Sequence, residues 1–218
     1  MGGVLAGALF LEEPMNKNAI FAALAALALA PVLSGCVAVA ATGVVAGMSA
    51  ARQERSVGDA VDDIRIRTEI QGALSKRSAA HFLNVSTTVI EGRVLLTGRI
   101  ADPQERLNAT RDAWRVQGVR KVDNAIEVID NSGWLDRPKD IFIRTEIAAD
   151  ILRDRSIRDV NYTIDVVNGV VYLVGVGQDQ AEIDRVIARA QRFQGVKRVE
   201  NYVVLKDDPQ RYFAAPQL

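Results

Sequence analysis

Few side chains in this sequence are suited to metal or nucleophilic chemistry. The 218 residues include one cysteine, Cys36, and one histidine, His81. A single cysteine cannot form an intrachain disulfide, and a lone histidine leaves too few ligands for a zinc or haem site. The serines lack a plausible partner pair of histidine and carboxylate. We therefore predict no catalytic residue, no metal site, no cofactor and no small-molecule substrate.

Cys36 lies in a context that indicates covalent lipid attachment. Met15-Asn-Lys-Asn is a short basic start, an apolar run over residues 19–30 follows, and the segment ends in Leu-Ser-Gly-Cys36. This is the layout of a secretory signal peptide. The apolar run is shorter than the roughly 20 residues that a membrane-spanning helix needs. We predict a signal peptide over residues 1–35, with translation beginning at Met15, and acylation of Cys36.

The rest of the chain contains an internal repeat at a constant offset of 77 residues. The segment Asp63–Ile70 returns as Asp140–Ile147 with a single change, Arg65 to Phe142. The same offset, without any insertion, aligns Asn84 with Asn161, Gly92 with Gly169, Gly98 with Gly175, and Asn124 with Asn201. Self-similarity at a fixed period indicates two copies of one structural unit.

Each copy has the pattern helix, strand, strand, helix, strand. Aliphatic residues at every fourth position predict the buried stripe of a first helix; they are Ile66, Ile70 and Leu74, and Ile143, Ile147 and Ile151. Hairpins are predicted at Val85–Ile90 with Arg93–Ile100, and at Tyr162–Val167 with Val170–Val176. The second helices run from Asp102-Pro103 toward Gly118 and from Asp179 toward Gly195, before last strands at Lys121–Ile129 and Lys197–Leu205. The fold class is therefore α+β, with a three-stranded sheet packed on two helices in each copy.

The segments outside the repeat lack such patterns. Residues 37–58 are rich in Ala, Val, Gly and Thr without a sustained helical stripe, which is typical of a flexible tether. The predicted organisation is a signal peptide at 1–35, the lipidated cysteine and tether at 36–59, a first domain at 60–130, a linker at 131–137, a second domain at 138–206, and a C-terminal tail at 207–218.

The charge balance argues against one class of partner. Lys and Arg number 27, as do Asp and Glu. A chain without net positive charge gives no support to nucleic-acid binding. We predict no nucleic-acid partner.

The repeated motifs carry a family resemblance. Gly92-x-Val-x-Leu-x-Gly98 with Gly118-Val-x-x-Val-x-Asn124, repeated in the second copy, resembles the signature of the BON domain over about residues 60–205. Leu-Ser-Gly-Cys36 resembles a lipobox, so the whole chain is similar to the dual BON-domain outer-membrane lipoproteins. The resemblance implies two tandem αββαβ BON domains on a lipid anchor in the outer membrane, facing the periplasm. It also implies a non-enzymatic role in phospholipid binding and envelope integrity.

The resemblance further implies where lipid binds. In the lipoprotein branch, the first helix of the second domain contacts anionic phospholipid, such as phosphatidylglycerol, through an aromatic residue near its start. The matching candidates here are Trp134, Leu135, Lys139, Phe142, Arg144 and Arg153. Phe142 lies off the buried stripe, so it is expected to face solvent or the domain boundary. Asp140, Glu146 and Asp150 share the segment, so this helix is not clearly basic.

An alternative function remains open at this point. Because the linker is short, Phe142 and Trp134 are candidates for sealing the interface between the two copies. Their burial there would favour a protein-protein interaction adaptor in the periplasm, tethered by its acyl group to the membrane and docking onto other envelope proteins. Exposure of Phe142 would favour direct binding of phospholipid.

Overall fold

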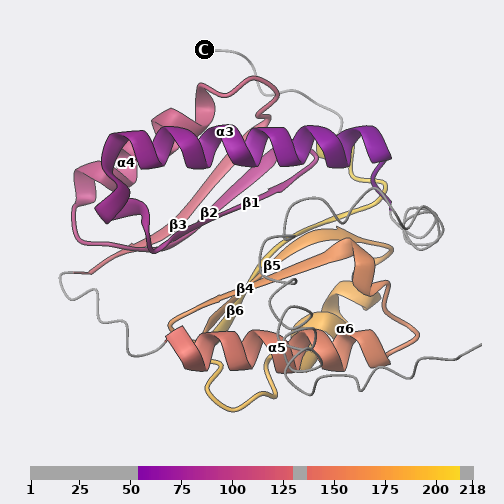
Figure 1. The fold of residues 1–218 in the computed structure, drawn as a ribbon. Coiled ribbons are helices and arrows are strands. Elements are labelled where there is room, and N and C mark those ends of the chain that lie inside the picture. The colour runs from indigo at the N-terminus through magenta and orange to yellow at the C-terminus, as the bar shows by residue number, and fades with distance from the viewer. Residues whose placement is uncertain (1–53, 130–136, 212–218) are drawn as a thin grey trace, which may run out of the picture. The chain divides into compact units, whose positions relative to one another are not determined.

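The computed structural model describes residues 54–129 and 137–211, and both stretches belong to one compact unit. Each repeat forms a three-stranded sheet with two helices, in the order helix, strand, strand, helix, strand (Figure 1). The element order and the α+β fold class confirm the predictions made from the repeat.

The two repeats have matching elements. The first consists of α3 (Val57–Phe82), β1 (Val85–Ile90), β2 (Arg93–Ile100), α4 (Pro103–Trp114) and β3 (Lys121–Val128). The second consists of α5 (Arg137–Arg153), the 3-10 helix η2 (Asp159–Asn161), β4 (Tyr162–Val167), β5 (Val170–Gly177), α6 (Gln180–Ala190) and β6 (Arg198–Leu205), before the 3-10 helix η3 (Pro209–Arg211). In each sheet the central strand pairs antiparallel with the preceding strand and parallel with the last one. The parallel pair requires a crossover, which α4 and α6 provide.

Both hairpin turns are held by a carboxylate from the first helix of the same repeat. The turn residues Glu91-Gly92 and Asn168-Gly169 all have positive φ. Asp63 accepts hydrogen bonds from the backbone N–H groups of Glu91-Gly92, both at 2.9 Å. Asp140 accepts the equivalent bonds of Asn168-Gly169 at 2.7 and 2.9 Å. Both aspartates are buried, so each links its helix to its hairpin without competition from water.

Glycine is required where the central strand passes the start of the preceding strand. A Cβ at Gly98 would lie 2.0 Å from the carbonyl oxygen of Asn84, and one at Gly175 would lie 2.1 Å from that of Asn161. Gly98 also has a φ of +124°, which other residues rarely adopt. This close backbone approach explains why the same glycine recurs in both repeats.

Each repeat buries its own core between its helices and its sheet. The predicted stripes are both fully buried, and each is accompanied by apolar residues from the central strand and the second helix. The first core includes Ile66, Ile70, Leu74, Val94, Leu96, Ala109 and Ala113. The second includes Ile143, Ile147, Ile151, Val171, Leu173, Val186 and Ala190.

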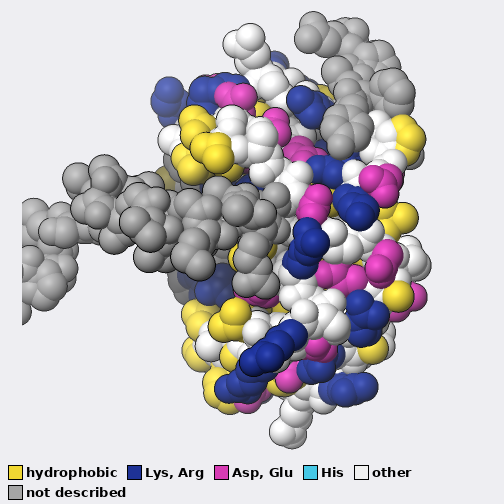
Figure 2. Space-filling view, turned by 90° about the vertical axis from the view of Figure 1, so that its right-hand side faces the viewer, with side chains coloured by type: hydrophobic (Ala, Val, Ile, Leu, Met, Phe, Trp, Pro, Cys, Tyr) yellow, Lys and Arg dark blue, Asp and Glu magenta, His cyan; other side chains and the backbone are white. Residues whose placement is uncertain are grey.

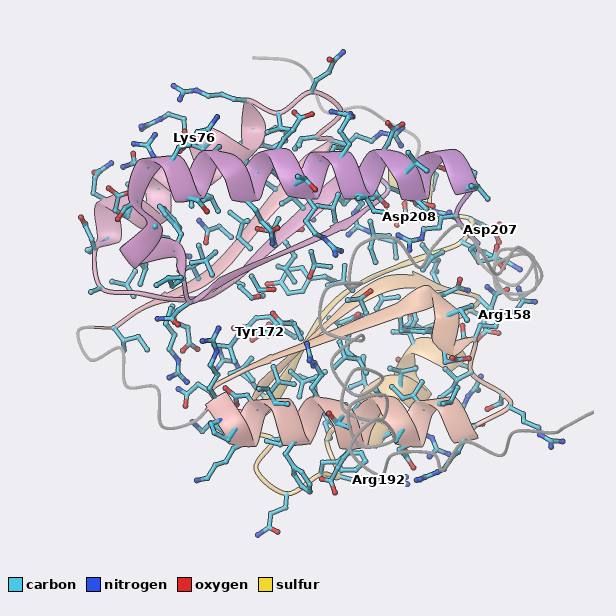
Figure 3. All side chains as sticks on the ribbon, viewed as in Figure 1. Lys76, Arg158, Tyr172, Arg192, Asp207 and Asp208 are labelled. Atoms are coloured by element: carbon cyan, nitrogen blue, oxygen red, sulfur yellow. The ribbon has the colours of Figure 1, made fainter. Side chains whose placement is uncertain are left out.

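A third cluster joins the two sheets on the faces that the helices leave open. It combines Ile90 and Leu95 of the first repeat with Val170, Tyr172, Val174 and Val176 of the second. Thr97 Oγ1 donates a hydrogen bond to the Asp165 carboxylate across this contact. Figure 3 shows Tyr172 at this level, where burial raises the pKa of its phenol to about 12. The helices of the two repeats therefore lie on opposite outer faces of the paired sheets.

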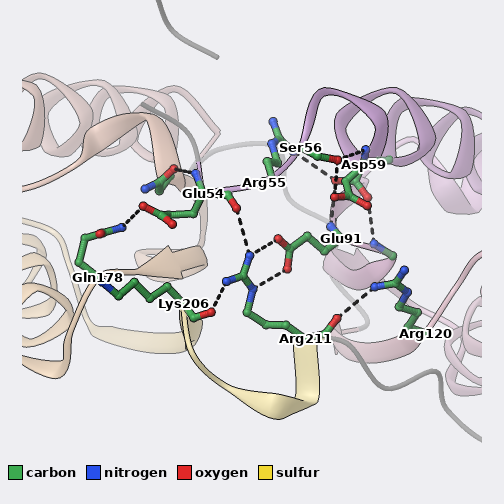
Figure 4. A network of polar contacts seen from close by, with 12 residues as sticks. Glu54, Arg55, Ser56, Asp59, Glu91, Arg120, Gln178, Lys206 and Arg211 are labelled. Carbon is green, nitrogen blue, oxygen red and sulfur yellow. Dashed lines mark hydrogen bonds and ion pairs between the residues drawn. The ribbon is translucent and has the colours of Figure 1, made fainter. Parts of the chain in front are cut away.

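A buried ion pair connects the end of the described chain with the first repeat. Arg211 of η3 donates from Nε to Glu91 at 2.8 Å and from Nη2 to the other carboxylate oxygen, and both side chains are less than a tenth exposed (Figure 4). Arg211 also donates to the backbone carbonyls of Glu54 and Lys206. Arg211, predicted as part of a C-terminal tail, thus packs against the first repeat.

The first helix begins earlier than the predicted start of the first domain at residue 60. Ser56 is its N-cap and accepts the N–H of Asp59 at 3.0 Å, so residues 57–59 of the predicted tether are helical. The helix extends to Phe82, with non-helical dihedral angles at Ser78, and so includes His81. Cys36 and the remainder of the predicted tether and signal peptide lie outside the described residues.

The surface of the described residues is mixed in charge. Figure 2 shows Lys and Arg side chains interspersed with Asp and Glu over one face of the molecule. Across residues 54–129 and 137–211, none of the helices combines the length and apolar character needed to cross a membrane.

Candidate functional site

The outer side of α5 carries an apolar row. Ile141, Thr145, Ala148 and Leu152 recur with helical spacing on the side opposite the buried isoleucine stripe. Ile141 is 53% exposed and Leu152 is 66% exposed, and Phe142 beside them is 62% exposed. The Thr145 hydroxyl donates to the carbonyl of Ile141 at 2.8 Å, so its polar group is already paired within the helix. We call these five residues the apolar row of α5.

Basic side chains lie along both sides of this row. Arg144 lies on one side of it, and Lys139 and Arg153 lie on the other, as a rotation of 100° per residue requires. All three are exposed. The outer face of α5 therefore combines apolar side chains with flanking cations.

The acidic residues of α5 are mostly directed away from this face. Asp140 is buried and caps the hairpin turn of its own repeat. Asp150 accepts a hydrogen bond from Arg189 of α6 at 2.7 Å, and this bond raises the pKa of the Arg189 guanidinium. Glu146, the third carboxylate of the helix, is half-buried, and the same rotation places it between Lys139 and Arg153. Two of the three carboxylates of α5, Asp140 and Asp150, are therefore engaged away from its outer face. This makes the outer face more basic than the sequence of the helix indicates.

The structure brings four of the predicted lipid-contact residues onto one helix. Lys139, Phe142, Arg144 and Arg153 are all exposed on α5. The alternative expectation, that Phe142 seals the interface between the copies, is wrong, because the sheets form that interface instead. Trp134 and Leu135 lie outside the described residues, as does Cys36.

Sequence reasoning missed the aliphatic members of the row. Ile141, Ala148 and Leu152 were not among the candidates, although the signal was available. Once the stripe of Ile143, Ile147 and Ile151 is assigned to the core, the helical rotation places these residues on the opposite side. Apolar residues on that side are unusual for a surface helix, and a contiguous exposed patch commonly marks an interaction surface.

The described residues offer little for metal chemistry. Among residues 54–129 and 137–211, no group of three or more His, Cys, Asp or Glu side chains is arranged to hold a metal ion. The large upward shift in the pKa of Tyr162 arises chiefly from burial, with the nearby Glu182 carboxylate adding to it. A phenol whose pKa is raised in this way stays protonated and is a poor general base.

The fold defines a protein built from two small α+β domains, the second of which exposes the apolar row of α5. The family model of the BON domain matches residues 62–130 and 142–207, which together span more than half of the chain. The chain therefore belongs to the BON domain family, as a protein with two such domains.

Three relatives share most of their length with this chain. An "Uncharacterized protein in gshII 5'region" of Anaplasma centrale is 40% identical over 147 residues, which cover 67% of this chain and 96% of that protein. The "Outer membrane lipoprotein DolP" of Haemophilus influenzae is 28% identical over 86% of this chain and 94% of its own length. The "Osmotically-inducible protein Y" of Escherichia coli is 27% identical over 72% of this chain and 79% of its own length.

Proposed function

We propose that this chain is a non-enzymatic envelope lipoprotein whose second BON domain binds anionic phospholipid through the outer face of α5. In this proposal the acylated Cys36 anchors the chain to the outer membrane from the periplasmic side. The two domains then help to maintain the integrity of that membrane. Two or more acyl chains suffice for stable anchoring, since each buried methylene contributes about 0.8 kcal/mol.

The observation that carries the proposal is the exposed apolar row of α5 with cations on both sides. An interfacial helix inserts apolar side chains among the acyl chains while its basic residues meet the lipid phosphates. Phe142 suits the interfacial region, as aromatic side chains generally do. Lys139, Arg144 and Arg153 would each contribute about 1 kcal/mol near an anionic surface.

The relatives support the cellular setting. One is named as an outer membrane lipoprotein and shares 94% of its length with this chain. The Leu-Ser-Gly-Cys36 sequence is consistent with the same anchoring in this chain. Anchoring would raise the local concentration of α5 at the membrane, so a weak intrinsic affinity of the helix would suffice.

The decisive experiment is co-sedimentation of the non-acylated body, residues 37–218, with liposomes. Phosphatidylcholine vesicles with and without phosphatidylglycerol are compared, at low and high salt. We expect binding that requires phosphatidylglycerol and weakens with salt. Phe142→Ala and Leu152→Ala should each lower the partition coefficient about fivefold to tenfold, because each removes apolar area that inserts into the membrane.

The matched control is Ile64→Ala on α3. Ile64 occupies the position equivalent to Ile141 and is 64% exposed, so its removal deletes a similar apolar area from the other repeat. The control should leave vesicle binding unchanged. Equal losses for the variants in both repeats, or no binding by a folded wild-type body, would contradict the assignment to α5.

A further inference from the structure

An open groove lies between α3 and α4 of the first repeat. It has a volume of about 470 Å³ and is lined by Ala73, Lys76, Arg77, Asp112, Arg115 and Val116. Figure 3 shows Lys76 on the outer side of α3. We call this the basic groove, because three of its six lining residues are cations.

The carboxylate in the basic groove is fully engaged by its neighbours. Asp112 accepts hydrogen bonds from Arg77 Nε at 2.6 Å, from Arg77 Nη2 at 2.9 Å and from Arg115 Nη1 at 3.1 Å. Glu105 also raises the pKa of Arg77 through its charge but does not line the groove. Arg115 is still 68% exposed at its side chain, and Lys76 is exposed as well. The groove therefore presents an excess of positive charge to solvent.

An apolar edge runs along α4 beside the groove. Leu107, Arg111 and Trp114 recur at helical spacing on the exposed side of this helix. Leu107 is 58% exposed and Trp114 is 43% exposed. Arg111 lies between them and the groove and is itself exposed. A partner that fills the groove would therefore meet cations first and then a tryptophan and a leucine.

The fold does not require the full combination, since the second repeat has the same architecture and retains the cations only at the positions of Lys76 and Arg115, as Arg153 and Arg192. The residues equivalent to Leu107, Arg111 and Trp114 are Asp184, Ala188 and Gln191. The cation of Arg77 is replaced by the carboxylate of Asp154. Tryptophan and arginine are enriched where protein interfaces derive most of their energy.

We propose that the basic groove and its apolar edge form a docking site for an acidic segment of another protein, with one large apolar side chain placed against Trp114. Charge complementarity favours an acidic segment. The position of the site favours a protein over a membrane, because α3 and α4 lie on the opposite outer face of the paired sheets from α5. This last step rests on the proposed function, in which α5 faces the membrane.

The test uses the full chain held in nanodiscs of phosphatidylcholine, which carries no net charge. The probe is a fluorescently labelled peptide rich in glutamate with one central leucine, and the matched peptide has glutamine in place of every glutamate. Fluorescence anisotropy should show binding of the acidic peptide alone, weakening with salt. The double variant Lys76→Glu with Arg111→Glu should weaken it at least about tenfold, because attraction becomes repulsion at two positions. Trp114→Ala should weaken it about fivefold.

The control variant combines Arg185→Glu on α6 with Arg192→Glu just beyond the end of that helix, and it changes the net charge equally in the second repeat. Both double variants leave the Asp112 pair intact, and circular dichroism verifies their folding. Peptide binding that is absent, or that falls equally in the two double variants, would overturn the docking site.

Vesicles containing phosphatidylglycerol provide the second readout. Loss of vesicle binding in the Lys76 and Arg111 variant, with peptide binding retained, would assign the groove to lipid and overturn the proposal. Failure of the α5 variants in the vesicle assay alone would instead affect the proposed function.

Discussion

The first helices of the two repeats, α3 and α5, bury equivalent residues and differ on the side that faces away from the sheet. Ile66, Ile70 and Leu74 correspond to Ile143, Ile147 and Ile151, and all are buried. On the outer side, however, Arg65, Gln71 and Ser75 of α3 are replaced by Phe142, Ala148 and Leu152 of α5. Three polar positions have thus become apolar while exposed.

Arg65 of the first repeat, at the position equivalent to Phe142, forms two hydrogen bonds. It donates to the Glu69 carboxylate at 3.0 Å and to the backbone carbonyl of Gln117 at 3.1 Å. It thereby satisfies a carbonyl just beyond the end of α4 and covers Gly118. Phe142 cannot donate such bonds, so the second repeat gives up this contact and gains an exposed aromatic ring. Replacing Arg65 by an exposed phenylalanine loses two hydrogen bonds and buries no ring, so it does not stabilise the fold. The replacement therefore supports a binding role for α5.

A second difference lies where the two helices of each repeat meet. In the first repeat Arg77 of α3 pairs with Asp112 of α4 at 2.6 Å. At the equivalent positions, Asp154 directly follows α5 and pairs with Arg189 of α6, also at 2.6 Å. The ion pair is therefore retained with its polarity reversed. The ion pair between the helices is thus retained although its residues are exchanged. The outer faces, in contrast, retain the pairs Ile64/Ile141 and Thr68/Thr145 and differ at the three positions named above.

The largest effect is expected where the hairpin turns differ. Glu91 in the first turn pairs with buried Arg211, whereas Asn168 in the second turn accepts a hydrogen bond from exposed Lys197 at 2.7 Å. Arg211→Met should lower the free energy of unfolding by about 3–5 kcal/mol, because it leaves a carboxylate buried without its partner. Lys197→Met should change it by less than about 0.5 kcal/mol, as a surface substitution.

Denaturant unfolding followed by circular dichroism measures both effects. The double variant Arg211→Met with Glu91→Met should recover much of the loss, since no buried charge then remains. A loss below about 1 kcal/mol for Arg211→Met would show that the pair is accessible to water.

The sequence predicted best those elements whose signals lie within a few neighbouring residues. The hairpins are set by the turns at Glu91-Gly92 and Asn168-Gly169, and β1, β2 and β4 were predicted to the residue. The capping of α3 by Ser56 was missed because Gly58 and the surrounding small residues obscure the helical periodicity. Ser56 three residues before Asp59 was nevertheless an available signal.

Contacts between distant segments were beyond sequence reasoning. Arg211 and Glu91 are separated by 120 residues, and nothing in either neighbourhood specifies the other. The packing of one sheet on the other left a weak signal in β5. Val170-Val-Tyr-Leu-Val174 is apolar at every position, which is typical of a strand buried on both faces. For the site, the helical spacing correctly placed Phe142 outside the core. The sequence did not show that Asp150 pairs with Arg189, or that Asp140 binds the hairpin turn, and so it did not show that these two carboxylates leave the outer face.

The reversed ion pair gives a sharper test of the comparison between repeats. Asp112→Ala should cost about 1–2 kcal/mol, because the carboxylate accepts three hydrogen bonds and is 7% exposed. Asp112→Arg should cost more, since it places like charges together beside Arg77 and Arg115. Adding Arg77→Asp should restore a large part of that loss by reproducing the polarity of the second repeat. A double-mutant cycle from denaturant unfolding gives the coupling, and additive losses would show that the reversal in the second repeat is not equivalent.

The smallest expected effect is the dependence of this pair on pH. The hydrogen bonds from Arg77 hold the pKa of Asp112 below its ordinary value of 3.8. The stabilisation is therefore fully present above that value and is lost as the pH falls through the lowered pKa of the folded state. Unfolding free energies measured between about pH 6 and pH 3 should decline toward acid in the wild type and decline less steeply in Asp112→Asn. The pKa of Asp154 is also lowered, chiefly by hydrogen bonds from Ser156 and also by Arg189, so Asp154→Asn should flatten the acid limb as well. If Asp112→Asn leaves the slope of unfolding free energy against pH unchanged, the pair between Arg77 and Asp112 does not persist in solution. The ion pair of the first repeat would then not stabilise the fold as its reversed equivalent in the second repeat does.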